Sequence, residues 1–300
     1  MSGTHRLNFD GRVAVVTGAG RGLGRAYAEL LASRGARVVV NDCDAEPADA
    51  VVREIAAAGG HAVASIASVA TPEGGQAIIA AALQAYGRLD IVIHNAGNVR
   101  RGSLRELSYA DFEAVLDVHL RGAFHVVRPA FPVLCDAGYG RIVLTSSIGG
   151  LYGNHGVANY AAAKAGLIGF GNVVALEGAA AGVKCNVIVP AAVTRMAEGI
   201  DTSGYPPMEP ELAAPAVGWL AHESCSVTGE VLIALAGRIA RAVVAESPGV
   251  YQPSWTIEQV GDRIEQIRDV QAPVIFPVVP DGHADHIRYS FGMATSEGEL

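Results

Sequence analysis

The segment Arg12-Val-Ala-Val-Val-Thr17 and the turn after it, Gly18-Ala-Gly-Arg-Gly-Leu-Gly24, decide the fold of this chain. The apolar run predicts a buried strand, and the following residues have the pattern of a helix that stops at Gly35. A second apolar run, 38–41, ends at the acid Asp42. A glycine cluster alone is often only a tight turn. Here the strand, turn, helix, strand and acid together predict a dinucleotide site, because glycines let a pyrophosphate approach the helix N-terminus and the acid accepts hydrogen bonds from a ribose diol.

The same alternation continues along the chain and predicts an α/β fold. We expect a Rossmann-like, doubly wound parallel sheet of about seven strands with helices on both faces, and an active site outside the carboxyl ends of the strands. Residues 1–240 would form this domain, and residues 241–300 a C-terminal extension. The predicted strands are 12–17, 37–41, 62–66, 90–94, 140–146, 184–189 and 230–235, and the predicted main helices are 22–34, 46–58, 72–86, 111–137 and 158–180.

Composition excludes several classes of protein. Half of the 300 residues are hydrophobic, which is enough to bury a large core. The net charge of −8 argues against a nucleic acid or an anionic membrane as partner. Four widely spaced cysteines, with no Cys-x-x-Cys pair, predict reduced thiols and no metal site. The first fifteen residues contain no signal-peptide core and no stretch is suited to span a bilayer, so we expect a cytoplasmic protein.

A second pattern, Tyr160-Ala-Ala-Ala-Lys164, has Ser147 thirteen positions before its tyrosine. In a helix, residues four apart share one face, so the phenol and the ammonium would point into one cleft. The pKa of a free phenol is about 10, and we expect the cation to lower it toward working pH. The alternative is a core tyrosine and a solvated lysine on an ordinary helix. The dinucleotide motif favours the catalytic interpretation.

Together these motifs resemble the short-chain dehydrogenase/reductase family over about residues 8–240. The resemblance implies that Tyr160 is the acid/base, that Lys164 lowers its pKa and holds the nicotinamide ribose, and that Ser147 donates to the substrate oxygen. Asn95-Ala96-Gly97 and Pro190, after two later strands, match further family motifs. The implied cofactor residues are Gly18, Arg21, Gly22, Leu23, Gly24, Asp42, Asn95, Ala96, Gly97, Tyr160, Lys164 and Pro190.

Three positions depart from the family's pattern. His119 stands where a proton-relay asparagine is usual, and it is either a relay residue or a structural histidine. Ala67 replaces an acid that usually holds adenine, which leaves the backbone of Val69 for that contact. The segment Pro190-Ala-Ala-Val193-Thr194 is one residue short, so the carboxamide contact falls on Thr194 or on the backbone as far as Val193.

Two residues disagree about the cofactor. Asp42 would repel a 2′-phosphate and accept from a free 2′-hydroxyl, whereas Arg21 occupies a position where some relatives bind that phosphate. We expect NAD in preference to NADP, because a carboxylate beside a phosphate is a direct like-charge clash. Arg21 can instead pair with Asp42 or point to solvent.

Several segments, among them His119-Leu-Arg-Gly122 and His222-Glu-Ser-Cys225, resemble the dehydrogenase parts of peroxisomal multifunctional enzymes of type 2. This resemblance implies a lipophilic small-molecule substrate, either a 3-hydroxyacyl-CoA thioester or a hydroxysteroid or similar alcohol. A CoA ester needs cations at the mouth of the cleft, where Arg100, Arg101, Arg105 and Arg195 are the candidates. A third hypothesis, a non-catalytic nucleotide sensor, is disfavoured by the intact Ser147, Tyr160 and Lys164.

Past residue 240 the family pattern stops. Thr256-Ile-Glu-Gln259 predicts a capping box that opens a helix with Ile257, Val260, Ile264 and Ile267 on one face. We expect this extension to pack on the core or on a partner subunit, or else to close a neighbour's pocket. Residues 195–215, with several glycines and prolines, predict a mobile loop, and the family resemblance implies a substrate lid at this place. The family implies a homodimer or homotetramer.

Overall fold

The structure is a computed structural model, and it describes residues 6–193, 204 and 206–296. The chain divides into two compact units, Met1–Arg241 and Ala242–Leu300. The first unit contains the sheet and the candidate site. The second unit is treated by itself.

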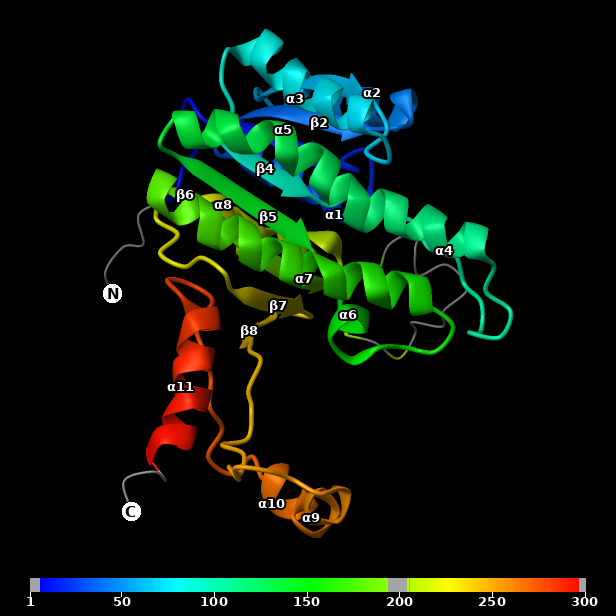
Figure 1. The fold of residues 1–300 in the computed structure, drawn as a ribbon. Coiled ribbons are helices and arrows are strands. Elements are labelled where there is room, and N and C mark those ends of the chain that lie inside the picture. Colours follow the sequence, from blue (N-terminus) through cyan, green and yellow to red (C-terminus); the bar gives the residue numbers. More distant parts are fainter. Residues whose placement is uncertain (1–5, 194–203, 205, 297–300) are drawn as a thin grey trace. The chain divides into compact units, whose positions relative to one another are not determined.

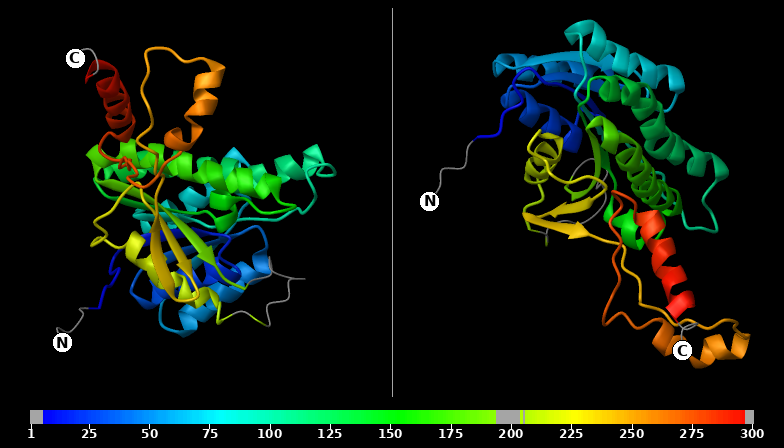
Figure 2. Two further views of the ribbon diagram at one scale, coloured as in Figure 1. Left: turned by 90° about the horizontal axis from the view of Figure 1, so that it is seen from below. Right: turned by 60° about the vertical axis from the view of Figure 1, so that its left-hand side comes forward.

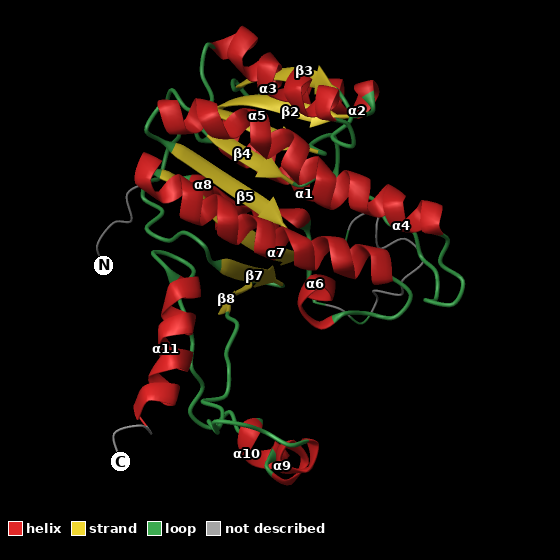
Figure 3. Cartoon of the chain, in the orientation of Figure 1, coloured by secondary structure: helices red, strands yellow, loops and turns green. Residues whose placement is uncertain are grey.

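The first unit is built on an eight-stranded sheet in the order β3-β2-β1-β4-β5-β6-β7-β8 (Figures 1 and 3). Strands β1 to β7 pair in parallel, which confirms the predicted doubly wound sheet. Every residue of β1, β4 and β5 is buried, as expected for central strands covered on both faces. The strands are β1 (Val13–Thr17), β2 (Arg37–Asp42), β3 (His61–Ile66), β4 (Ile91–His94), β5 (Gly140–Thr145), β6 (Val183–Ala191), β7 (Val231–Leu235) and β8 (Arg238–Ala242).

Helices cover both faces of this sheet (Figure 2). On one face α1 packs against α2 and α8, and on the other α5 packs against α3 and α7. The helices of the first unit are α1 (Gly22–Ser33), α2 (Ala45–Ala57), α3 (Pro72–Tyr86), α4 (Tyr109–Leu116), α5 (Gly122–Asp136), α6 (Ile148–Tyr152), α7 (Ala158–Gly178) and α8 (Ala214–Ala221), with short 3₁₀ turns η2 (Ala179–Ala181) and η4 (Pro210–Leu212).

The eighth strand is an addition to the predicted sheet. It follows β7 through Ala236 and Gly237, whose φ values are 46° and 80°. Two left-handed residues in a two-residue connection are typical of a tight hairpin, which makes this pair antiparallel. Three of the five residues of β8 are exposed, among them Arg238 and Arg241. Its sequence therefore lacks the apolar run by which the other strands can be predicted.

Two predicted helices are interrupted. The one expected over 111–137 consists of α4, a π-helical turn η1 (Asp117–Arg121) and α5. The one expected after Thr256 begins with the predicted capping box, but it divides at Arg263 into α9 (Ile257–Asp262) and α10 (Ile264–Ile267). The second unit also contains α11 (Gly282–Ser296), which no pattern in the sequence predicts.

A buried carboxylate joins the amino ends of the two central strands. Asp90, which is 2% exposed, precedes β4 and accepts hydrogen bonds from the Val13 amide at 2.9 Å and from the guanidinium groups of Arg12 and Arg88. Burial by itself would raise the pKa of Asp90. The bonds from Arg88, Val13 and Arg12 outweigh burial and hold that pKa below its usual value.

We expect Asp90→Asn to lower the free energy of unfolding by about 2 kcal/mol at pH 7, because the two arginines lose their charged acceptor. The unfolded pKa of an aspartate is about 3.9, and the folded pKa of Asp90 lies below it. Its stabilising contribution is therefore complete above that pH and is lost as the pH falls through the folded value. Urea unfolding should show a difference between variant and parent that is constant from pH 7 to 5 and narrows below about pH 4. The exposed Asp49→Asn on α2 is the control, and a pH-independent difference would contradict the assignment.

Candidate active site

The glycine turn lies against the loop that follows β4. Gly18 has a φ of +60° and Gly22 of +54°, in the left-handed region that favours glycine. A Cβ at Gly18 would lie 2.7 Å from the Cα of Ala96, and one at Gly24 would lie 2.2 Å from the carbonyl oxygen of Gly18. Side chains at these positions would force the turn apart from its neighbours. The N-terminus of α1, where Leu23 packs partly buried against the core, therefore has the geometry that binds a pyrophosphate.

Asp42 lies beside this turn at the end of β2. One carboxylate oxygen accepts the amide of Gly20 at 3.1 Å, and the other accepts the amide of Asp44 at 3.2 Å. Arg21 does not pair with Asp42; its guanidinium forms an ion pair with Asp44 at 2.9 Å. Asp42, Cys43 and Asp44 are close enough together to hold a metal ion, but Asp44 and Cys43 are exposed and Asp42 is already bonded to the backbone.

The hydroxyl of Thr17 connects the ends of β1 and β4. It accepts the amides of Asn95 at 3.0 Å and Ala96 at 3.1 Å. The side-chain amide of Asn95 donates back to the carbonyl oxygens of Thr17 and Gly18. The predicted Asn95-Ala96-Gly97 loop is thus bonded directly to the glycine turn.

Ser147, Tyr160 and Lys164 come together at the carboxyl end of β5. Ser147 is the N-cap of α6, and its hydroxyl accepts the Gly149 amide at 3.1 Å. Tyr160 and Lys164 lie one turn apart on α7, and the Lys164 ammonium lies 5.6 Å from the centroid of the phenol ring. The neighbouring Ser146 is buried and donates to the Lys164 carbonyl at 2.7 Å, so it holds α7 and Ser147 is left facing the phenol.

Burial opposes the charged form of each titratable group in this trio. It raises the pKa of Tyr160, which a side-chain hydrogen bond with Ser147 and the charge of Arg101 lower only in part. Burial also lowers the pKa of Lys164 to about 7. The prediction that Lys164 brings the Tyr160 pKa toward working pH is wrong for the chain by itself, because burial dominates and the ammonium is directed to the carbonyl of Thr145.

His119 lies on η1 directly beside the phenol. Its fully buried ring meets the ring of Tyr160 edge to face, with centroids 5.2 Å apart. Its Nε2 lies 2.8 Å from the carbonyl oxygen of Asn98, and its Nδ1 has no partner among the described residues. Burial, and then the charge of Lys164, hold its pKa well below the usual value, so the ring is neutral. A relay role for this ring stays a prediction.

The other predicted cofactor residues are less well placed. The carbonyl of Val69 accepts from His125 at 3.0 Å. Pro190 lies within β6, where it pairs with Ala234 of β7, and not after the strand as predicted. The amide of Val193 donates to the Met208 carbonyl at 2.8 Å and is not free to hold a carboxamide. Thr194 and Arg195, with the rest of 195–203 and residue 205 of the predicted lid, lie outside the described residues.

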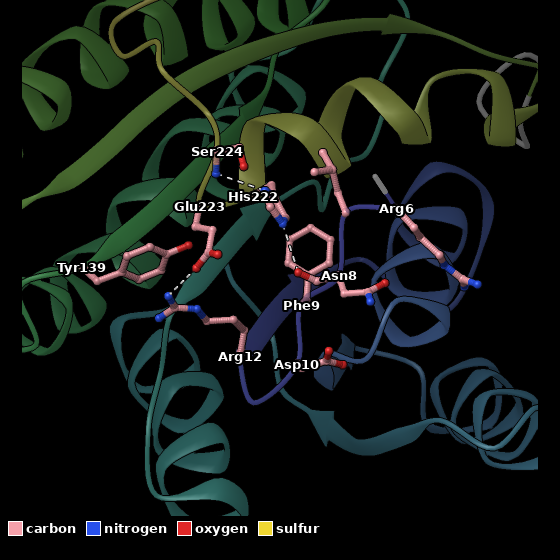
Figure 4. A pocket seen from close by; sticks show the side chains of 10 residues that line it. Arg6, Asn8, Phe9, Asp10, Arg12, Tyr139, His222, Glu223 and Ser224 are labelled. Atoms are coloured by element: carbon pink, nitrogen blue, oxygen red, sulfur yellow. Dashed lines mark hydrogen bonds and ion pairs between the residues drawn. The ribbon is translucent and has the colours of Figure 1, made fainter. Parts of the chain in front are cut away.

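A cavity of about 410 Å³ lies at the other end of the strands, by the amino ends of β1 and β5 (Figure 4). Arg12 pairs there with Glu223 at 3.0 Å, and His222 donates to the Asn8 carbonyl. Because these polar groups are paired with one another, we interpret the cavity as structural and not as a ligand site. The chemistry is concentrated at the carboxyl ends instead.

Two residues near the site were not assigned a role at the catalytic centre from the sequence. His94, the last residue of β4, is 1% exposed and contacts both Thr17 and His119. Its signal was a polar residue at the end of an apolar strand. Arg101 was expected only at the mouth of the cleft, yet its charge lowers the pKa of the Tyr160 phenol in part.

Comparison with known proteins agrees with this geometry. A family model described as short chain dehydrogenase matches residues 12–203. The chain is 47% identical over 280 residues to a peroxisomal multifunctional enzyme type 2 of Drosophila melanogaster, covering 88% of this chain and 46% of that protein. It therefore spans about half the length of this curated relative.

Two solved structures share the fold. That of the full-length Drosophila melanogaster enzyme superimposes with a TM-score of 0.77 at 44% identity, over 89% of this chain and 47% of the other. A short chain dehydrogenase from Mycobacterium avium gives a TM-score of 0.78 at 40% identity, over 86% of this chain and 94% of the other. With its glycine turn and its Ser147, Tyr160 and Lys164 at one end of the sheet, this chain belongs to the short-chain dehydrogenase/reductase family and is an oxidoreductase that acts on CH–OH groups.

Proposed function

We propose that this protein is an NAD-dependent dehydrogenase of 3-hydroxyacyl-CoA thioesters. The observation that carries the proposal is the meeting of Ser147, Tyr160 and Lys164 beside a turn where only glycine fits. The substrate class rests on the similarity to multifunctional enzymes of type 2 and to a fungal protein named peroxisomal hydratase-dehydrogenase-epimerase. A hydroxysteroid or other lipophilic alcohol is the alternative substrate.

The residues divide the work of alcohol oxidation. Tyr160, as the phenolate, takes the proton of the alcohol, and Ser147 donates a hydrogen bond to the same oxygen. Lys164 donates to the Thr145 carbonyl at the end of β5 and would hold the ribose of a bound dinucleotide. A bound NAD would supply the acceptor for the hydride of the alcohol carbon. The glycine turn and the carboxylate of Asp42 fit its pyrophosphate and adenosine ribose.

We predict that Tyr160→Phe lowers kcat by about 10²–10⁴-fold, because it removes the proton acceptor and leaves the ring in place. The dissociation constant of NAD should stay within about twofold, since one hydroxyl outside the dinucleotide turn is lost. Initial rates and calorimetric titration measure the two quantities. Tyr86→Phe on α3 is the matched control. Residual activity above a tenth of the parent would show that another group is the base.

NAD is proposed over NADP on the position of Asp42 and Arg21. The carboxylate of Asp42 is held beside the turn by two amides, where a 2′-phosphate would meet it. The guanidinium of Arg21 pairs with Asp44, which weakens its attraction for that phosphate.

We expect kcat/KM to be at least about tenfold higher with NAD than with NADP, a difference of about 1.4 kcal/mol. Asp42→Ala should reduce this ratio, because the like-charge repulsion is removed. Steady-state rates with each cofactor test both statements. A preference for NADP in the parent would mean that Arg21 determines the specificity.

The loop after β4 that carries Arg100 and Arg101, here called the arginine loop, supports a CoA ester as the substrate. Gly102 forms a bridge with Val157, and the Asn159 side chain donates to the Arg100 carbonyl at 3.1 Å, so the loop is tied to the start of α7. This arrangement brings the exposed Arg101 near Tyr160, three residues into that helix. Arg100 instead bonds the Val99 carbonyl and lies 3.8 Å from Asp111.

We predict that Arg101→Gln raises KM for a 3-hydroxyacyl-CoA about tenfold at low salt and less at high salt, because exposed charges are screened. KM for a truncated pantetheine ester should change little. Loss of the Arg101 charge should also raise the Tyr160 pKa and move the rise of kcat to higher pH with both substrates. Arg100→Gln is the matched control. An equal effect of Arg101→Gln on KM of both esters would exclude recognition of the CoA phosphates.

We propose that the extension packs on a second copy of the chain in a homodimer or homotetramer. Among residues 242–295, whose burial is described, only Gly282 is buried, so this part of the extension lacks a core of its own. Ile257, Val260 and Ile264 are 88%, 42% and 44% exposed. Ile257→Asp together with Val260→Asp should shift the sedimentation of the full chain toward the monomer. A monomeric parent would refute the proposal.

The cytosol is the proposed compartment. All four cysteines are free thiols, as a reducing compartment favours. Within the part of the chain that the structure describes, no helix combines the length and apolar character needed to cross a bilayer. The relatives are named as peroxisomal proteins, so localisation of a tagged full-length chain tests this proposal.

A further inference from the structure

The buried histidine at the end of β4 lies between the cofactor turn and the catalytic tyrosine. The Nδ1 of His94 is 3.2 Å from the hydroxyl oxygen of Thr17, and its Nε2 is 3.1 Å from the carbonyl oxygen of His119. Its side chain is therefore bonded at both ends, to β1 on one side and to the π-helical turn on the other.

The direction of these two bonds follows from their partners. The carbonyl of His119 can only accept, so Nε2 of His94 carries the proton. The hydroxyl oxygen of Thr17 already accepts two amides, from Asn95 and Ala96, so its proton is donated to Nδ1. The direction of every hydrogen bond in this network is therefore fixed.

The imidazole of His94 stays neutral over the working range of pH. Burial, and then the charge of Lys164, lower its pKa to about 3, against the opposite effect of the His119 and Val118 carbonyls. His119, which is also buried and neutral, is the other titratable group on η1 that faces this network. The bond directions therefore do not reverse between pH 5 and 8.

The π-helical turn transmits the position of His94 to the phenol. A π turn widens a helix and changes the pairing of its main-chain groups. Here the carbonyl of His119 accepts from His94 as well as from the Gly122 amide. The ring of His119 has little room, because a Cβ at Gly97 would come within 2.3 Å of its Cε1. On its other side it meets the ring of Tyr160 at 87°.

We propose that His94 is a positioning residue that fixes the π-helical turn, and through His119 the phenol of Tyr160, to the dinucleotide turn at Thr17. Its Nδ1 contacts the dinucleotide turn through Thr17, and its Nε2 contacts the π-helical turn that positions the acid/base. The inference rests on the role of Tyr160 proposed above. It assigns to His94 no contact with the substrate.

Substitution of His94 by two different amide side chains tests its two hydrogen bonds separately. The amide of asparagine reaches the place of Nδ1, so His94→Asn keeps an acceptor for Thr17 and loses the donor to His119. The amide of glutamine reaches the place of Nε2, so His94→Gln keeps the donor to His119 and loses the acceptor for Thr17. Each variant removes one hydrogen bond, so a general loss of packing should affect the two alike.

We expect His94→Asn in the full chain to lower kcat about tenfold and leave the dissociation constant of NAD within about twofold. His94→Gln should keep kcat within about threefold and weaken NAD binding about tenfold. Initial rates at saturating substrate, calorimetric titration of NAD and thermal unfolding measure the three effects. Equal changes in both variants, in step with their melting temperatures, would overturn the proposal, as would a His94→Asn variant with the parent's kcat.

Tyr160→Phe is measured alongside to separate the two hypotheses. If Tyr160→Phe keeps its turnover, the proposed function fails. If Tyr160→Phe loses its turnover while His94→Asn does not, only the positioning role of His94 fails.

Discussion

The site depends on the hydrogen bonds that the hydroxyl of Thr17 accepts. This hydroxyl accepts the amides of Asn95 and Ala96, and so joins the ends of β1 and β4 where the sheet reverses its order. At that point a doubly wound sheet has its crevice for ligands, because the crossovers on either side of it run to opposite faces. The glycine turn can lie against Ala96 only because Gly18 has no side chain. The cofactor site is therefore a property of two strand ends held together, and the glycines are necessary but not sufficient for it.

The candidate catalytic groups, Tyr160 and Lys164, lie at the same end of the sheet at an electrostatic cost. Tyr160 and Lys164 are largely withdrawn from water, so burial opposes the phenolate of one and the ammonium of the other. As the pH rises through about 7, Lys164 of the chain by itself loses its charge. Ser147 and Arg101 act in the opposite direction and lower the pKa of the phenol in part, so the loop that carries Arg101 affects the charge state of Tyr160. Buried neutral His94 and His119 add polar contacts without adding charge.

The central strands and the crossover helices could be predicted because each carries its own local signal. An apolar run such as 13–17 is buried on both faces, and a helix such as α1 has a glycine stop. The interruptions could not be predicted in this way. The π turn at Asp117–Arg121 has no composition that distinguishes it from the helices on either side. The contacts that accompany it, of His119 with His94 and Tyr160, join residues far apart in the chain. Strand β8 lies at the edge of the sheet beside β7, although two of its five residues are arginines.

For the site, the sequence by itself determined which residue types are present and at what spacing. Gly18, Gly22, Gly24, Asp42, Ser147, Tyr160 and Lys164 all follow from motif and register, since neighbours on one turn or one helix face have fixed relative positions. Only the tertiary structure decided which of several candidates is near the phenol. It separates Arg101 from Arg100, and it pairs Arg21 with Asp44 where a pairing with Asp42 was one of the alternatives. It also brings His94 to His119 across 25 positions of sequence. These distinctions depend on burial and on contacts between strand ends far apart in the chain, which no local pattern encodes.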